Sequence, residues 1–566
     1  MRTRLAVLLT AMLTVGATVL TLTTSPASGQ LLTEQSFAAY GTGTAIAVNA
    51  LGLGDTTVAG VHAARSSGAV NSGGLTAITD EFGQNVTPAL PGKNAYGRGT
   101  GLEAGLVVPS IQDVNVNQLL LSGLAQASAP PPQGPIVQEL PLDLSPVLFA
   151  GLLRGEAQAI FDPAVCALGQ PITFGRGHAA NLQLLGEVDS ALLATDIADD
   201  NVSTSRTFTY FIPNGDGTFG LVSETHQHVA PISVLNTGEA GGELLRIEVA
   251  GEEAGGAFGL RAFATGKPGG AGIEFLGNPI VTITPGGGGS PLQIALSDIL
   301  GPEGLNLDLP GVATVSLGGP PRAINGEALS PPAVAADGTS ASAAVDVVAR
   351  VQLLEILGLL DLGAGHMEAA VQVPAGGVRC NIPIAKTATP NPAVAGDTVT
   401  WSITIPEPGA FSQFIACDLT NIRAVDTHEV ESGNPRFQLT GASHGGVIQG
   451  NTVTWNNLGT YRRGDPPIVV TVTGRILGGS GVLRDTAQVF VDLTNCTGGI
   501  EGTLAGLAQF QNAAATGAVT LRGPEVGRGQ LAATGGDSRY LLLGGVLLLG
   551  ALGIRRRLRT RPEATG

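Results

Sequence analysis

The sequence predicts an all-β protein, with a large glycine-rich N-terminal region of strands followed by a β-sandwich. Glycine supplies 83 of 566 residues, while only 13% of residues are charged and 4% are aromatic, which argues against a coiled coil or a large helical enzyme. Glycine and proline together stay below the roughly 25 to 30% expected of low-complexity disorder. Because 43% of residues are apolar, the chain can bury a sizeable core.

The clearest sandwich pattern covers residues 381–498. Val399, Trp401, Ile403 and Ile405 alternate with Thr and Ser, which is the period of a half-buried strand. Similar short runs follow at 451–455, 468–473 and 486–492. Roughly seven such strands form a β-sandwich.

Residues 30–380 form a second β-rich region, of one domain or two. Strands are predicted at 39–48, 207–212, 218–222 and 244–249, with a hairpin turn at 214–217. The segment 344–356 fits either a strand or a helix. Its β-branched valines favour one strand that places Val345, Val347, Ala349, Val351 and Leu353 on the same face. The tetraglycine within 284–290 is either a hairpin tip or a linker.

Residues 1–29 have the order of a secretory signal peptide. Arg2 and Arg4 precede the apolar run 5–22, and small residues suited to a peptidase follow Pro26. The alternative, an N-terminal membrane anchor, is disfavoured by the threonine content of the run and by Pro26.

The C-terminal segment 531–566 combines four features in a fixed order. The pentapeptide 531–535 is followed by a short polar spacer, the apolar stretch 540–554 and five closely spaced arginines. As a helix the apolar stretch rises about 22 Å, somewhat short of a hydrocarbon core of about 30 Å, although local thinning accommodates it. The arginines keep the end of the chain cytoplasmic and halt export.

This tail resembles the cell-wall sorting signal of Gram-positive surface proteins, in the variant with Ala532 where proline is usual. The resemblance implies that a sortase recognises Leu531, Ala532, Thr534 and Gly535. The enzyme would attack the Thr534 carbonyl, release Gly535 onward, and transfer the chain to an amine of a peptidoglycan precursor. Residues 499–530 would then be a wall-proximal linker. The alternative is a plain single-pass membrane anchor.

Residues 381–498 resemble the Ig-like repeat of bacterial envelope proteins known as the DUF-eleven domain. The resemblance rests on the opening Lys386-Thr-Ala-Thr-Pro390 and on the strand Gly396-Asp-Thr-Val-Thr-Trp401. It implies an Ig-like β-sandwich that serves as a spacer or interaction module without catalytic residues. Pro406 to Gly409 depart from the family pattern. Upstream, the chain has a diffuse similarity to choice-of-anchor surface domains.

Four cysteines occur, at Cys166, Cys380, Cys417 and Cys496. An even count in an exported chain predicts disulfides, and four cysteines allow three connectivities. Domain layout favours Cys166–Cys380 and Cys417–Cys496, and free buried thiols are the alternative. No cysteine pair has the spacing of a zinc site.

The best candidates for metal binding are His226 and His228, which share a strand face with Glu224. A solvated polar strand face is the preferred interpretation, and Asn214 to Thr218 is read as a turn instead of a calcium loop. We therefore expect no metal and no cofactor.

Charge excludes nucleic acid as a partner. The net charge is -16, and removal of the signal peptide and of everything after Thr534 takes it to about -22, whereas phosphate binding needs clustered Lys and Arg. Only three of the 29 basic residues are lysines, as GC-rich codons would give. This usage agrees with the high-GC Gram-positive source that the resemblance of the C-terminal tail implies.

Two classes of function fit these features. The first is a non-enzymatic protein of the cell wall and cell surface (an adhesin, scaffold or display stalk) whose partners are a sortase, covalently attached peptidoglycan and, transiently, the membrane. The second is a wall-anchored enzyme such as a polysaccharide hydrolase. Trp401 and Trp455 are the two tryptophans, and both lie in the C-terminal module, so no tryptophan is left to stack on sugars elsewhere.

Overall fold

The computed structural model describes residues 36–494 and 509–521 apart from short internal stretches. Outside the described residues lie 1–35, 54–55, 80–84, 108–118, 146–147, 163–165, 185–192, 196–201, 215, 217, 235–241, 252–255, 287–288, 296–304, 310–312, 318–330, 346–347, 354–359, 381–383, 408–415, 495–508 and 522–566. The predicted signal peptide and sorting signal are therefore not described. The predicted all-β fold is confirmed, because the regular elements of the described residues are strands.

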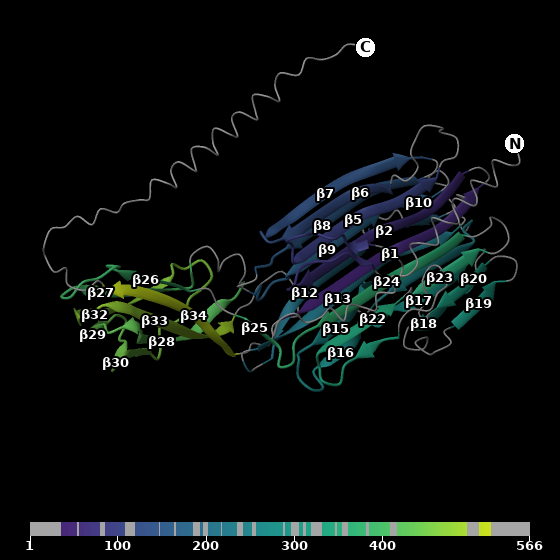
Figure 1. Cartoon of the computed structure of the whole chain (residues 1–566). Coiled ribbons are helices and arrows are strands. Elements are labelled where there is room, and N and C mark those ends of the chain that lie inside the picture. Colours follow the sequence, from purple (N-terminus) through teal and green to yellow (C-terminus); the bar gives the residue numbers. More distant parts are fainter. Residues whose placement is uncertain are drawn as a thin grey trace, which may run out of the picture.

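Strands before residue 380 form two large antiparallel sheets that face each other (Figure 1). The first has ten strands, and its main path runs β19-β20-β23-β24-β1-β2-β5-β6. Its members are β1 (Ala38–Leu53), β2 (Thr56–Asn71), β5 (Ala95–Val107), β6 (Leu119–Ala129), β19 (Leu305–Leu309), β20 (Ala313–Leu317), β21 (Ala333–Val334), β22 (Ser340–Val345), β23 (Ala349–Leu353) and β24 (Leu360–Gln372). A separate small hairpin joins β3 (Ile78–Thr79) and β4 (Asn85–Thr87).

The facing sheet has thirteen strands, and its main path runs β11-β10-β8-β9-β12-β13-β14-β17-β18. Its members are β7 (Gln133–Leu144), β8 (Leu148–Ala159), β9 (Thr173–Ala180), β10 (Gln183–Leu184), β11 (Leu193–Thr195), β12 (Val202–Pro213), β13 (Thr218–Val234), β14 (Leu245–Ala250), β15 (Phe258–Ala264), β16 (Ala271–Leu276), β17 (Ile280–Pro285), β18 (Leu292–Ala295) and β25 (Val378–Arg379). Together the two sheets make a sandwich, which we call the first sandwich.

Glycines let the two sheets of the first sandwich touch backbone to backbone. A Cβ added to Gly99 of β5 would lie 2.0 Å from the Arg176 carbonyl oxygen of β9, and one added to Gly177 would lie 2.3 Å from the Thr100 oxygen. Sheets separated by ordinary side chains stay about 10 Å apart, so larger residues at these positions would force the sheets away from each other. Part of the glycine excess in the composition is thus a packing requirement.

Hydroxyl groups fill the interface beside these glycines. Ser66 Oγ of β2 lies 2.7 Å from both Ser205 Oγ and Thr207 Oγ1 of β12, and all three residues are buried. Gly41 and Gly43 of β1 lie against the same layer of serine and threonine side chains. Buried hydroxyls need partners, and here they supply them to one another across the two sheets.

The segment 344–356 differs from the single strand predicted for it. It contains the end of β22 and then β23, and both strands pair with β24, through Val345 opposite Met367 and Ala349 opposite Ala364. Gly365 lies between Ala364 and Met367 and has a φ of 88°, so β24 leaves the regular extended conformation there. Its partner changes at the same place, from β22 to β23. Val347 lies outside the described residues.

The other strand predictions hold in outline. The predicted hairpin joins β12 to β13 and is closed by the Asn214 N–H, which donates to the Thr218 oxygen at 2.9 Å. The tetraglycine lies between β17 and β18, which pair with each other, so it belongs to a hairpin and not to an interdomain linker.

Strands from residue 385 onward form a second sandwich, which lies at one end of the first (Figure 1). One sheet contains β26 (Ala385–Thr389), β27 (Thr398–Ile405), β29 (Arg436–Ala442) and β32 (Ile468–Gly478). The other contains β28 (Asp418–Gly433), β30 (Val447–Gln449), β31 (Thr452–Trp455), β33 (Gly481–Thr494) and β34 (Gln509–Leu521). Trp401 and Trp455 are among its fully buried side chains.

Strand β34 lies within the stretch 499–530 that the sequence assigns to a linker. It pairs with β33 along most of its length, from Asp492 opposite Gln509 to Gly481 opposite Leu521. A free β33 edge would present unpaired backbone groups, and β34 satisfies them.

The predicted Cys166–Cys380 disulfide is present, with its Cα atoms 5.5 Å apart, and it ties the end of the first sandwich to a loop 214 residues earlier. Cys417 is also disulfide-bonded, and Cys496, the partner predicted for it, lies outside the described residues. Next to Cys417, the Ala416 N–H donates to the Leu168 oxygen at 2.9 Å and connects the two sandwiches.

No helix among the described residues is long and apolar enough to cross a membrane.

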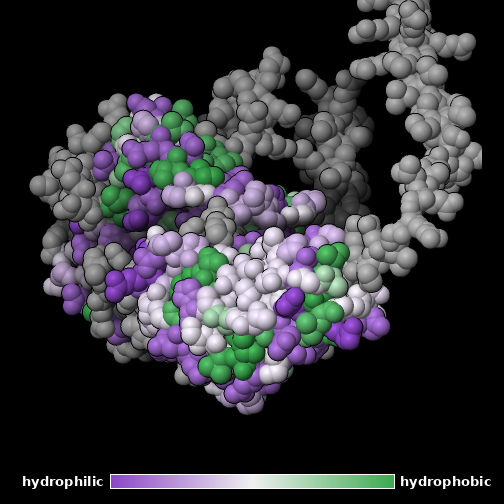
Figure 2. Space-filling model, turned by 90° about the vertical axis from the view of Figure 1, so that its left-hand side faces the viewer, coloured by the Kyte–Doolittle hydropathy of each residue, from purple (hydrophilic) through white to green (hydrophobic). Residues whose placement is uncertain are grey.

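Figure 2 views the molecule from the side on which the second sandwich lies. Hydrophobic residues form several separate groups there, between hydrophilic and intermediate ones. Exposed large apolar residues of this sandwich include Val394, Val430, Val447, Val469 and Leu477. Scattered exposure of this kind is usual on protein surfaces and does not by itself mark a binding site.

Candidate functional site: a buried ion cluster in the second sandwich

Four ionisable side chains meet in the core of the second sandwich. Lys386 comes from β26 in one sheet, while Asp426 and His428 of β28 and Asp485 of β33 come from the other. On β28 and β33 buried and less buried residues alternate, and the two aspartates and the histidine occupy buried positions of that alternation. The strand period therefore points these polar groups into the core.

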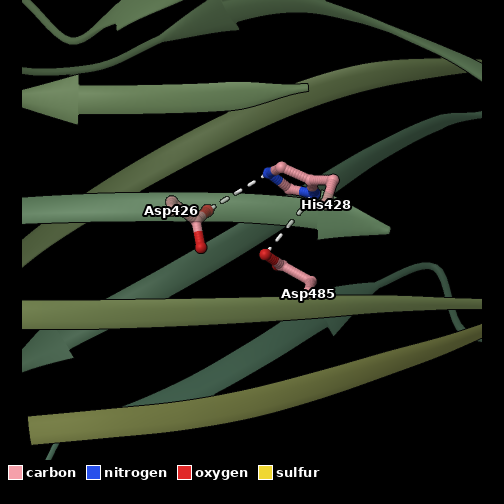
Figure 3. Close-up of side chains that lie close together, drawn as sticks. All are labelled: Asp426, His428 and Asp485. Atoms are coloured by element: carbon pink, nitrogen blue, oxygen red, sulfur yellow. Dashed lines mark ion pairs between the residues drawn. The ribbon is translucent and has the colours of Figure 1, made fainter. Parts of the chain in front are cut away.

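Figure 3 shows His428 between Asp426 and Asp485, the part of the cluster contributed by one sheet. Lys386 Nζ donates a hydrogen bond to Asp426 Oδ1 and also contacts Asp485 Oδ1. His428 Nε2 lies 3.2 Å from Asp426 Oδ2, and His428 Nδ1 lies 3.4 Å from Asp485 Oδ1. The side chains are at most 1% exposed. One lysine and one histidine are thus held between two carboxyl groups without access to solvent.

Aromatic rings close the site on the side of the histidine. The Trp401 ring meets the His428 ring edge to face, with centroids 4.6 Å apart, and Phe437 lies 6.2 Å from the same ring. Water is excluded, so the ionic contacts act in a medium of low polarity, where charge is costly unless it is paired.

The two carboxyl groups differ in protonation. Burial raises the pKa of Asp485, and the negative charge of Asp426 raises it further, to about 8. Burial also acts to raise the pKa of Asp426, but the His428 ring and the Lys386 ammonium outweigh that effect and lower it. At neutral pH Asp426 is therefore a carboxylate and Asp485 a neutral acid.

This cluster also has the ligand types of a metal site, because one atom each of Asp426, His428 and Asp485 lie within 4.8 Å of one another. The Lys386 ammonium, however, contacts both carboxyl groups and already supplies the positive charge that the Asp426 carboxylate needs. A metal ion would have to displace a buried lysine, so we do not assign these residues as metal ligands.

The sequence-predicted candidates on β13 form a different arrangement. Glu224 Oε2 accepts hydrogen bonds from Tyr210 Oη at 2.8 Å and from Arg261 Nε at 2.7 Å, and Glu224 Oε1 contacts His226 Nε2. Glu224 is 2% exposed and His226 is 6% exposed. The interpretation of this strand face as solvated is therefore wrong: long side chains of β12 and β15 lie over it and bury the ion pair.

His228 does not join that group. Its Nδ1 lies 2.9 Å from the Val202 oxygen instead, so Glu224, His226 and His228 do not converge as three ligands. Asp216, in the turn predicted at 214–218, pairs with Lys267 at 2.8 Å and accepts a hydrogen bond from Thr218 Oγ1 at 2.7 Å.

Leu531, Ala532, Thr534 and Gly535 lie outside the described residues. Sequence patterns did not single out Lys386, Asp426 or Asp485 for chemistry. The signal was present in part, because Asp426 and His428 are two residues apart and share one face of a strand, but the strand itself was not predicted. Only the fold brings Lys386 to them from the other sheet.

No protein-family model matches the chain, and no curated protein matches it. Among solved structures, the N-terminal domain of an adhesin from Streptococcus gordonii aligns with 68% of this chain and 100% of its own, at 10% identity and a TM-score of 0.17. A score this low does not establish a shared fold.

Proposed function

We propose that this chain is a secreted surface protein, attached covalently to peptidoglycan by a sortase, which acts as an adhesin, scaffold or display stalk. The observation that carries the proposal is the order of signals along the chain: an export signal first, a sorting pentapeptide, apolar stretch and arginine cluster last, and β-sandwiches between them. In this arrangement the protein is the substrate of a transpeptidase.

The fold supports display outside the cytosol. The Cys166–Cys380 disulfide belongs to a class of bond that persists mainly in oxidising compartments. Wall attachment near residue 534 would leave the second sandwich closer to the peptidoglycan and the first sandwich farther from it. The second sandwich then serves as a stalk for the larger one.

The two tryptophans bear on the alternative of a polysaccharide hydrolase. Trp401 is fully buried and Trp455 is 1% exposed. Trp455 Nε1 also donates to the Ser443 oxygen at 2.7 Å within the module. Neither indole is available to stack on a sugar ring, which favours the non-enzymatic class.

Fractionation of the producing cells tests the proposal. Walls stripped of membrane with detergent are digested with a muramidase, and the chain is followed by antibody. We expect the chain in the muramidase digest and not in the detergent extract, and a Thr534→Ala variant should move to the membrane or medium. Recovery of the wild-type chain in the detergent extract would instead favour a plain membrane anchor, and recovery in the cytosol would reject export.

A further inference from the structure

We propose that Lys386 and Asp485 join through an intramolecular amide bond, formed within the folded second sandwich with loss of one water. The bond would link Lys386 Nζ to Asp485 Cγ, and it would be independent of wall anchoring because all its groups lie inside one module. The inference rests on the placement of an amine against a carboxyl group in a site that excludes water.

The fold holds both reacting groups in place. Lys386 lies on β26, which pairs with β27 through Lys386 opposite Ile403, and Asp485 lies on β33, directly opposite His428 of β28. Lys386 Nζ contacts Asp485 Oδ1 although the two strands belong to different sheets. Because the fold already holds the amine and the carboxyl group in contact, their reaction does not have to pay the entropy of bringing two separate groups together in water.

The protonation states suit the reaction. A carboxylate resists attack by an amine, whereas a neutral carboxylic acid can lose its hydroxyl as water. Asp485 is buried beside the negative charge of Asp426, an environment that favours the neutral acid, and its raised pKa agrees. Asp426, in contrast, accepts a hydrogen bond from Lys386 and is held ionised. Asp485 is therefore the electrophile, and Asp426 is the base.

The step balances without any further reactant. The Lys386 ammonium gives one proton to the Asp426 carboxylate and becomes a neutral amine. Its nitrogen attacks Asp485 Cγ, the C–N bond forms, a second nitrogen proton passes to the hydroxyl of the acid, and the C–O bond breaks to release water. The amide keeps one N–H, and Asp426 ends as a neutral acid that can donate to the new carbonyl oxygen.

The change also removes buried charge. Before the reaction an ammonium and a carboxylate face each other in the core, and afterwards the Lys386 nitrogen and the Asp426 and Asp485 groups carry no charge. Since buried ions carry a desolvation cost, the environment favours the amide over the ion pair. The product would join β26, the first strand of the second sandwich, to β33 by a covalent bond. It would thereby link the two sheets of this sandwich.

Exposed pairs lack these conditions. Lys267 Nζ lies 2.8 Å from Asp216 Oδ2, but the two side chains are 35% and 51% exposed, and the pKa of Asp216 is lowered to about 2, first by the hydrogen bond from Lys267. That carboxylate stays ionised in water. The Lys267–Asp216 pair is thus a matched control within the same chain.

Peptide mass spectrometry of the reduced and alkylated full chain tests the proposal. Trypsin cuts after Arg379, Arg423 and Arg484, so an amide bond blocks cleavage at Lys386 and joins peptide 380–423 to peptide 485–522. We expect one branched product with the summed mass of both peptides less one water. Peptides 207–246 and 262–322, which carry the control pair, should be recovered unlinked.

Any other pattern of tryptic peptides overturns the assignment of an amide bond to Lys386 and Asp485. Free peptides 380–386 and 485–522 would show that no bond forms, and a link to peptide 424–436 would place it at Asp426 instead. In variants, Asp485→Ala should abolish the branched product, and Asp426→Ala should abolish it although both reacting groups remain. A branched product in either variant contradicts the proposed roles. The digest of the wild-type chain decides the matter even where a variant fails to fold.

Discussion

His428 of β28 lies directly opposite Asp485 of β33, and their side chains approach to 3.4 Å in the core of the second sandwich. Cross-strand neighbours inside a sandwich are ordinarily apolar. Here the pair belongs to a cluster that includes a lysine from the facing sheet, so the two sheets are joined through ionic groups as well as through apolar packing.

Loss of Lys386 should destabilise the second sandwich. Lys386→Met keeps most of the length of the side chain but leaves the Asp426 carboxylate buried without its amine partner, which costs about 3 to 5 kcal/mol. The measurement is the free energy of unfolding from urea titration at pH 7. Lys267→Met, which removes an exposed partner of Asp216, should change it by about 1 kcal/mol or less. Equal effects of the two substitutions would contradict the structural role of the cluster.

Glu224 should make the stability of the first sandwich depend on acid pH. Burial acts to raise its pKa, but His226 and Arg261 outweigh burial and lower it from 4.5 to about 2. A lowered pKa means that the stabilisation is present above the unfolded value and is lost as pH falls from about 4.5 to about 2, with a total of about 3 kcal/mol.

Urea unfolding of the wild type and of Glu224→Gln checks this dependence from about pH 5 to about pH 2, the range over which the group titrates. The difference in unfolding free energy between the two proteins should shrink as pH falls. A difference that stays constant over this range would mean that Glu224 has its ordinary pKa in the folded protein.

Close approach of the two large sheets should make Gly177 intolerant of a side chain. In Gly177→Ala the new methyl would meet the Thr100 and Arg65 carbonyl oxygens at 2.3 and 2.4 Å, and the expected cost of such overpacking is about 1 to 3 kcal/mol or more. Gly73→Ala is the control, because its Cβ would meet only the Asn71 side chain, at 3.3 Å. Thermal unfolding followed by circular dichroism should show a lower Tm for Gly177→Ala alone. Matching Tm values would indicate that the sheets lie farther apart.

The Cys166–Cys380 disulfide should stabilise the first sandwich strongly because it closes a loop of 214 residues. On the chain-entropy account, removal of both cysteines costs about 5 kcal/mol. The measurement compares urea unfolding of Cys166→Ala/Cys380→Ala with the oxidised wild type. Because reduction also opens the disulfide of Cys417, the reduced wild type is compared with the equally reduced variant, and the first sandwich should unfold at the same urea concentration in both. If reduction leaves the unfolding of the wild type unchanged, the Cys166–Cys380 bond has no structural role.

Strands and turns were readable from the sequence where the signal is local. Val399 to Ile405 alternates with a period of two, and Asn214 to Gly217 has the composition of a hairpin turn. Close contact between Gly99 and Arg176 could not be read in the same way, because it depends on two strands of different sheets. Small residues in a strand indicate a close neighbour without identifying it.

The polar clusters illustrate the same limit. Glu224 and His226 were recognised as sharing a strand face, but their burial comes from Tyr210 and Arg261 on neighbouring strands. Lys386 and Asp485 are almost a hundred residues apart in the sequence, and each alone looks like an ordinary surface charge. Only the fold, in which Lys386 of one sheet reaches Asp485 of the other, places them together.

Attachment of the chain to the wall through Thr534 is the central claim, and the C-terminal peptide of the wall-released protein tests it most directly. Trypsin cuts after Arg528, so a transferred chain yields peptide 529–534 carrying a peptidoglycan stem. An untransferred chain yields peptide 529–539, which ends at Arg539. We predict the first peptide, with the added mass on Thr534, in muramidase digests. Peptide 529–539 as the sole C-terminal product of surface protein would contradict the account.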